Sequence, residues 1–221
     1  MTGLDVEAEV KKKLAKILEK MPKIPEGYKI YEGPEGICFA RDHFYWYDKN
    51  FNPIDPPDEI NDDFSCSYTD ITSLEGCPKK VSGSLDCSYT EITSLKGAPR
   101  KVGGSFLCSN IDITSLEGGP EEVGLSFWCT YTNITSLEGC PRIIGRSFNC
   151  SNTKITSLKG CPKIVNGDFN CSRTSIASLE GCPKEVGSEF HCSDTNLTSL
   201  KGAPAKIGDI TYSRFQYSIS P

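Results

Sequence analysis

A 21-residue repeat dominates the sequence and limits what the chain can fold into. Seven copies follow one another from Phe64 to Ile210 without insertion or deletion, beginning at Phe64, Leu85, Phe106, Phe127, Phe148, Phe169 and Phe190. A fixed period in this range is typical of solenoids, in which each repeat forms one coil that packs only on its neighbours. The sequence therefore predicts one elongated body closed by caps, rather than a set of globular domains.

The fourth copy, FWCTYTNITSLEGCPRIIGRS, carries the pattern that all copies share. Phe127 and Cys129 stand two residues apart, the spacing that places both side chains on one side of a short strand. Ile134, Leu137 and Ile144 return to the core at irregular spacing, so we expect turn and loop over the rest of the coil. The pattern predicts a mainly β repeat solenoid.

The segments outside the repeat predict two caps, because an uncovered coil would expose its core and a strand edge. Residues 1–63 form the N-terminal cap, which begins with an amphipathic helix over residues 5–21. An aromatic β-hairpin follows over residues 37–47, and a linker rich in Pro and Asp then leads to the first coil. The pattern dissolves after Ile210, and residues 211–221 form the C-terminal cap.

Four residues of the repeat carry a resemblance to a known family. The leucine-rich repeat has two apolar places, then a place for asparagine or cysteine, then another apolar place. These places are filled here, in order, by Phe127, Cys129, Thr132 and Ile134, so residues 64–210 resemble that family. The phrase TSLEGCPKxVxGxFxCS is similar to the short cysteine-bearing repeats of uncharacterised proteins of tailed bacteriophages. The resemblance implies a right-handed stack of coils with a concave sheet that binds proteins, and no reaction. Threonine at the asparagine place and the scarcity of leucine depart from the pattern, so a right-handed parallel β-helix is the alternative.

The spacing of the 12 cysteines follows the repeat rather than a disulfide framework. Seven occupy one position of every copy: Cys66, Cys87, Cys108, Cys129, Cys150, Cys171 and Cys192. Four more share a second position with Ala98, Gly119 and Ala203, namely Cys77, Cys140, Cys161 and Cys182. We therefore expect reduced, buried thiols that act as small apolar side chains. No two CxxC elements have zinc spacing, so we expect no metal and no cofactor, and metal binding by stacked thiolates is an alternative.

Charge and hydropathy exclude two classes of partner. No stretch has the length or apolar character of a signal peptide or of a bilayer-spanning helix. The net charge of −5 lies in residues 1–63, which hold nine basic and fourteen acidic side chains, whereas the remainder holds fifteen of each. That balance gives no basic footprint for nucleic acid. We expect a cytoplasmic protein that binds neither nucleic acid nor membrane.

The positions that vary between copies are the candidates for recognition, and they form three columns. The residue between phenylalanine and cysteine points outward if the strands form a sheet: Ser65, Asp86, Leu107, Trp128, Asn149, Asn170 and His191. Two residues after cysteine lies a second column: Tyr68, Tyr89, Asn110, Tyr131, Asn152, Arg173 and Asp194. The third column begins with Asp70, Glu91 and Asp112. We predict that a partner contacts Leu107, Trp128, Tyr89, Tyr131 and Tyr68, with Asp86, Asp70, Glu91 and Asp112 facing a basic rim on that partner.

The functional expectation is a non-catalytic protein-binding module. His43 and His191 are the only histidines, and no nucleophile, base and carboxylate set or phosphate-binding glycine loop can be assembled, so we expect no enzyme activity. The resemblance implies a phage-encoded factor that acts on a host protein in the host cytosol. A structural role in a virion or an adhesive is the alternative, and Phe44–Tyr47 is the alternative binding surface.

Overall fold

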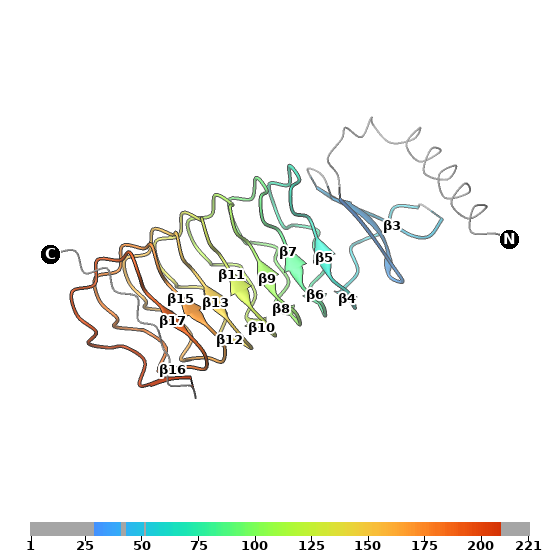
Figure 1. Ribbon diagram of the computed structural model, residues 1–221. Coiled ribbons are helices and arrows are strands. Elements are labelled where there is room, and N and C mark those ends of the chain that lie inside the picture. Colours follow the sequence, from blue (N-terminus) through green and yellow to red (C-terminus); the bar gives the residue numbers. More distant parts are fainter. Residues whose placement is uncertain (1–28, 41–42, 51, 209–221) are drawn as a thin grey trace, which may run out of the picture.

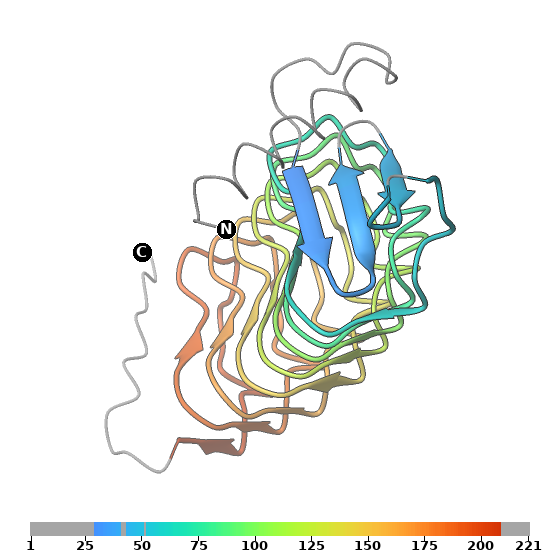
Figure 2. The same cartoon turned by 90° about the vertical axis from the view of Figure 1, so that its right-hand side faces the viewer.

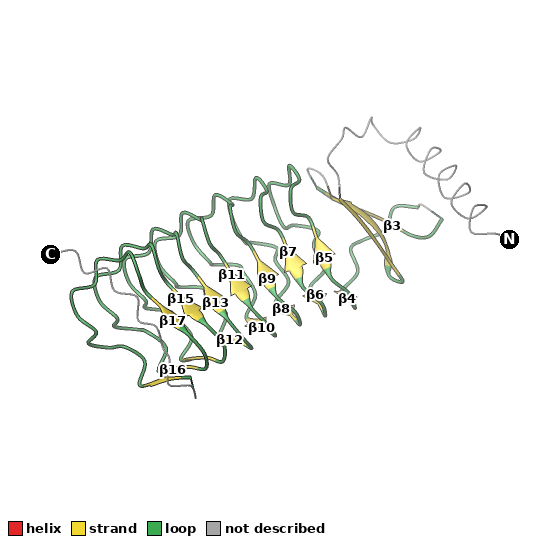
Figure 3. Cartoon of the chain, viewed as in Figure 1, coloured by secondary structure: helices red, strands yellow, loops and turns green. Residues whose placement is uncertain are grey.

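A stack of coils closed at one end by a small sheet makes up the protein (Figure 1). The computed structural model describes residues 29–40, 43–50 and 52–208. Strands, turns and loops account for the secondary structure of these residues, and no helix occurs among them (Figure 3). The predicted mainly β repeat solenoid is therefore confirmed. The predicted helix at residues 5–21 and the predicted cap at residues 211–221 lie outside the described residues.

The first sheet is parallel and takes one strand from each of the seven copies. Its strands are β5 (Phe64–Ser65), β7 (Leu85–Asp86), β9 (Phe106–Leu107), β11 (Phe127–Trp128), β13 (Phe148–Asn149), β15 (Phe169–Asn170) and β17 (Phe190–His191). They pair in register, so that Phe127 lies between Phe106 and Phe148. The first residue of each strand points into the core, and the second points outward.

A second row of parallel strands lies on another side of the coils, where turn and loop were expected, so that expectation is wrong. One sheet holds β4 (Glu59–Ile60), β6 (Lys80–Val81), β8 (Lys101–Val102), β10 (Glu122–Val123) and β12 (Ile143–Ile144). A separate sheet holds β14 (Ile164–Val165), β16 (Glu185–Val186) and β18 (Lys206–Ile207). Two residues are too few to show alternation in a single copy, and pairing arises because the next coil repeats them. Strand β4 comes from the predicted linker, so this row begins before the first copy.

The core between the two rows is built from the constant residues of the repeat. In the fourth coil the buried residues are Phe127, Cys129, Ile134, Leu137 and Ile144. The phenylalanine rings stack on one another from Phe106 to Phe190, with ring centroids 5.3 to 5.6 Å apart. This stacking gives each coil a large apolar contact with both neighbours, which a single coil of this length cannot provide for itself.

Two local devices turn the chain. The Thr132 hydroxyl donates to the carbonyl oxygen of Cys129 at 2.8 Å, and five other coils repeat this bond with the threonine at the same place. In the third coil Ile111 takes that place and is buried. Gly139 has a φ of 86°, and a Cβ there would lie 2.6 Å from the backbone nitrogen of Glu117 in the preceding coil. Glycine is required there both for the left-handed backbone and for the close approach of the coils.

A three-stranded antiparallel sheet covers the first coil (Figure 2). It consists of β1 (Lys29–Gly33), β2 (Gly36–Ala40) and β3 (Phe44–Tyr47), one strand more than the predicted hairpin. Trp46 is 3% exposed, stacks on the ring of Phe64 at 5.7 Å and donates its indole N–H to the carbonyl of Gly76 at 2.9 Å. The ring of Tyr31 meets Phe64 from another side at 5.6 Å. The sheet therefore shields the end of the apolar stack from water.

Candidate functional site

The outward residues of the first sheet place the main apolar candidates side by side. Trp128 is 46% exposed on β11, and Leu107 and Asp86 are half-buried on the two preceding strands. The register pairs Trp128 with Leu107 and Leu107 with Asp86. The prediction that these residues lie outside the core on one sheet face is confirmed. Together they make an apolar surface beside a carboxylate.

The polar members of this column have a structural task that Trp128 and Leu107 cannot perform. The side-chain oxygens of Asp86, Asn149 and Asn170 each accept the backbone N–H two residues further on, at 2.9 to 3.1 Å. Such bonds shape the turn that follows the strand. A tryptophan or leucine at the same place gives up this bond and exposes apolar surface instead. That exchange is unfavourable for folding and therefore favours a role in recognition.

The second variable column occupies a left-handed turn that sequence reasoning missed. Every member has a positive φ of 54 to 59°: Tyr68, Tyr89, Asn110, Tyr131, Asn152, Arg173 and Asp194. Asparagine and aspartate tolerate this region, whereas tyrosine and arginine adopt it at a cost. The sequence does indicate a left-handed turn, since three of the seven residues are Asn or Asp. The tyrosines in the same column were interpreted only as contact residues. The column is thus both the apex of a turn and a candidate contact surface.

The three tyrosines at these turns are exposed. Tyr68, Tyr89 and Tyr131 are 66%, 48% and 57% exposed. The rings of Tyr68 and Tyr89 are stacked, with centroids 4.5 Å apart and planes within 8°. Asn110 separates Tyr89 from Tyr131 in the column, so the structure joins the first two tyrosines and leaves the third apart. The result is an exposed aromatic pair near one end of the sheet and a separate exposed ring in the fourth coil, the coil that also carries Trp128.

The acidic candidates lie just after the turn, in successive coils. Asp70, Glu91 and Asp112 are exposed. Asp112 accepts a hydrogen bond from the side-chain amide of Asn133 at 3.1 Å, whereas Asp70 and Glu91 have no hydrogen bond or ion pair among the described residues. Three stacked carboxylates repel one another and favour a cation beside them. The predicted acidic border is therefore present at the same end as the tyrosine pair.

The alternative surface, Phe44–Tyr47, is mostly committed to packing. Trp46 is buried against the first coil, and Phe44 is half-buried against Phe64, with ring centroids 5.4 Å apart. Tyr45 is 37% exposed and faces outward. The strand therefore presents little aromatic surface compared with the tyrosine column.

The cysteines pack in or against the apolar core in this structure. All 12 lie among the described residues and all are free thiols. Burial raises the pKa of the column thiols, to about 12 at Cys66 and well above the usual range at Cys87 and Cys129. Thiols in that state are protonated and poor nucleophiles or ligands at neutral pH. Within residues 29–40, 43–50 and 52–208, no three His, Cys, Asp or Glu side chains are grouped to hold a metal ion.

The histidines do not form a catalytic group with one another. His191 lies on the last strand of the first sheet, with its Nε2 3.0 Å from a carboxylate oxygen of Glu189, and His43 is exposed at the opposite end of the stack.

Comparisons with protein-family models, with curated proteins and with solved structures give no match. A search of the described residues finds no helix with the length and apolar character needed to cross a membrane.

Proposed function

We propose that the protein is a non-catalytic binding module that holds a protein partner against the outer face of the first sheet. The observation that carries the proposal is the set of exposed tyrosines at left-handed backbone positions. A bulky residue held in a costly conformation persists where function selects it, and aromatic side chains are the commonest anchors of interfaces. Trp128 and Leu107 add an apolar surface at places where the polar members of their column form hydrogen bonds to the following turn.

The partner carries a basic rim in this proposal. Asp70, Glu91 and Asp112 border the tyrosines, and Asp86 lies beside Leu107. Lysine and arginine side chains gain from carboxylates and from the faces of exposed aromatic rings at the same time. The Tyr68 and Tyr89 pair next to Asp70 and Glu91 offers both, so we expect basic residues of the partner at this end and its apolar residues at Trp128.

The finer part of the proposal rests on the sequence resemblance. The cysteine-bearing phrase of the repeat supports a leucine-rich-repeat-like, phage-encoded protein that acts on a host protein in the cytoplasm. Reduced thiols in the core are consistent with a reducing compartment.

The test is an affinity capture from bacterial lysate that compares four versions of the full-length protein. Wild type and Thr156→Ala, an exposed residue outside the face, should retain the same partner. Trp128→Ala and Tyr131→Asn should retain at least tenfold less of it, because they remove central aromatic contacts. Equal recovery by all four, with every variant folded, would remove the first sheet from the proposal. Assembly of the purified protein into filaments without any partner would support the structural alternative instead.

A further inference from the structure

The second row of strands is interrupted between the fourth and fifth coils. Strands β10 and β12 pair, and β14 and β16 pair, but β12 and β14 do not. Elsewhere in this row the residue at this place donates its backbone N–H to the preceding segment, as Gly145 does to Val123 and Gly187 to Val165, at 2.9 and 2.8 Å. That residue is glycine except in the first coil, where Ser82 donates to Ile60 at 2.9 Å. Asn166 occupies that place in the fifth coil and makes no such bond. Its side-chain amide instead approaches the carbonyl of Gly145 at 3.4 Å.

A steric conflict at Asn166 explains the interruption. A Cβ on Gly145 would overlap the carbonyl oxygen of Gly124, and a Cβ on Gly187 would overlap that of Asn166. The coils approach this closely where the residue is glycine or, at Ser82, has a short side chain. The side chain of Asn166 is larger, and the fifth coil stands away from the fourth on this side. The interruption is local, since the N–H of Gly167 again donates to the carbonyl of Arg146 at 2.8 Å.

The first sheet remains intact opposite this opening. Phe148 and Phe169 are paired in register, with ring centroids 5.5 Å apart. Their planes are inclined by 25°, whereas the two neighbouring ring pairs are inclined by 5° and 12°. The two coils are therefore held together on one side and parted on the other, which produces a wedge-shaped space.

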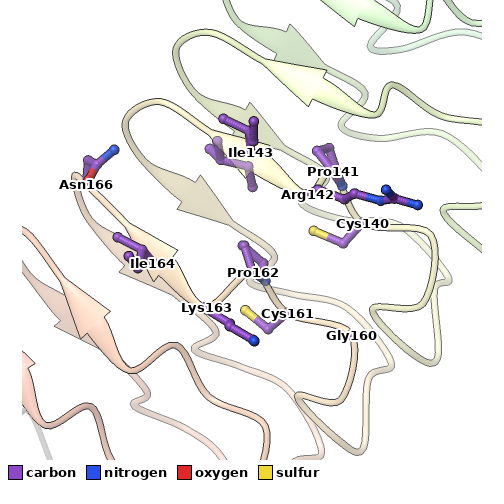
Figure 4. Close-up of a pocket in the computed structure, with 11 residues that line it drawn as sticks. Cys140, Pro141, Arg142, Ile143, Gly160, Cys161, Pro162, Lys163, Ile164 and Asn166 are labelled. Carbon is purple, nitrogen blue, oxygen red and sulfur yellow. The ribbon is translucent and has the colours of Figure 1, made fainter.

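This space is an open pocket of about 540 Å³ whose lining is more apolar than polar (Figure 4). Corresponding segments of the two coils form it, and each contributes the same kinds of side chain. Its apolar lining includes Cys140, Pro141, Ile143, Cys161, Pro162 and Ile164. Ile143 and Ile164 are 57% and 50% exposed. At the same place in the second and third coils, Lys101 and Glu122 form an ion pair. The opening thus replaces a salt bridge with exposed aliphatic surface.

Two cations line the same cavity without a partner. Arg142 and Lys163 are exposed and form no ion pair among the described residues. In the same column Lys79 pairs with Asp58 at 2.7 Å, and Arg100 pairs with Glu121. The fifth and sixth coils supply Lys163 and Lys184 where an acidic residue would be needed to continue the pairing. Positive charge is therefore left beside an apolar space.

We propose that this cavity binds a small amphipathic anion, an aliphatic carboxylate, with its chain between the parted coils and its carboxylate against Arg142 and Lys163. The volume lies in the range of small-molecule sites, about 300 to 1,000 Å³, and the apolar lining with a few polar groups is typical of such sites. A guanidinium can bind a carboxylate in a bidentate manner, and an ammonium adds a second charge. This site lies away from the outer face of the first sheet and does not depend on the function proposed for that face.

Titration of the full-length protein with octanoate, followed through isoleucine methyl resonances, tests the proposal. Ile143, Ile144 and Ile164 should shift in a saturable manner, while Ile71 and Ile92, in the first two coils, should not. Octylammonium, with the same chain and the opposite charge, should bind at least tenfold more weakly. Absence of saturable shifts, or equal binding of the two probes, would overturn the proposal.

Two variants and one control connect the result to the cavity. Arg142→Glu combined with Lys163→Glu should weaken octanoate binding at least tenfold, whereas Lys96→Glu, an exposed charge reversal in the second coil, should leave it unchanged. Asn166→Gly removes the side chain that parts the coils, so it should also weaken binding at least tenfold in a folded protein. Octanoate binding that persists in either variant would show that the ligand lies elsewhere.

Discussion

The two rows of strands differ in what holds successive coils together. The first sheet stacks Phe and Cys side chains beneath it and runs without interruption through all seven coils. The second row has one inward Val or Ile per strand, followed by glycine in most coils and by Ser82 in the first, and it divides into two sheets at Asn166. A large apolar contact tolerates differences between coils, whereas a close backbone approach does not. The first sheet therefore supplies continuity, and the second row is where one residue can open the stack.

The largest effect should come from the thiols beneath the first sheet. The six column cysteines from Cys66 to Cys171 are fully buried, and burial raises their pKa above the value of about 8.5 expected in the unfolded chain. Their contribution to stability is present below that pH and is lost as pH rises towards the folded pKa, about 12 at Cys66. Between pH 9 and pH 10 each thiol should lower the free energy of unfolding by about 1 kcal/mol, so the six together should lower it by roughly 6 kcal/mol.

We therefore expect the protein to unfold steeply between pH 9 and pH 11, which circular dichroism as a function of pH measures. Cys108→Ala removes one titrating group and should reduce the steepness by about one proton. A free energy of unfolding from urea denaturation that is the same at pH 8 and pH 10 would mean that the thiols titrate as they do in the unfolded chain, and hence that they are not buried as described.

The next largest effect should separate the inside of the first sheet from its outside. Phe127→Ala leaves a cavity in the ring stack and should lower the free energy of unfolding by about 3 to 5 kcal/mol. Trp128→Ala, on the adjacent outward position, should change it by less than about 1 kcal/mol, since that side chain is 46% exposed. Urea denaturation of both variants gives the two values. The reverse order would invert the assignment of faces, and with it the proposed binding surface.

A smaller loss of stability is expected from a substitution that interrupts the second row between two other coils. Gly145→Asn puts a side chain where a Cβ overlaps the carbonyl of Gly124, so β10 and β12 should part, at a cost of about 1 to 3 kcal/mol. Amide hydrogen exchange should show that the N–H of residue 145 loses its protection. Leu125→Asn, an exposed change one turn away, is the control and should leave both quantities unchanged. A fully protected amide in Gly145→Asn would mean that glycine is dispensable there.

How far the sequence predicts this structure depends on whether a feature is repeated or particular to one coil. The period, the buried Phe and Cys columns and the threonine turn bonds recur in nearly every copy, so the pattern predicts them. The second row was missed because a two-residue strand such as Glu122–Val123 shows no alternation by itself. The opening at Asn166 was also missed, because it arises from contact with the preceding coil and one copy in isolation contains no sign of it.

The candidate site was predicted only in part, for a related reason. The outward positions of Trp128 and Leu107 follow from alternation within a strand, and the structure confirms them. The left-handed backbone at Tyr131 could have been inferred from Asn110, Asn152 and Asp194 in the same column, residues that tolerate positive φ. The stacking of Tyr68 on Tyr89 could not, because the sequence does not fix the directions of the two side chains.

The smallest effect concerns the turns at the end of the first sheet, where we expect stability and binding to change in opposite directions. Tyr131→Asn places a residue that tolerates positive φ at a φ of 55°, so it should raise the free energy of unfolding by on the order of 0.5 to 1 kcal/mol. Tyr68→Asn relieves the same strain at a φ of 59° but loses the stacked contact with Tyr89, so its stability should change little. Both variants should bind the partner more weakly, because each removes an exposed ring. Urea denaturation and affinity capture measure the two quantities on the same samples. If Tyr131→Asn instead destabilises the fold and leaves capture unchanged, the tyrosine is retained for packing, and its exposure carries no information about a partner.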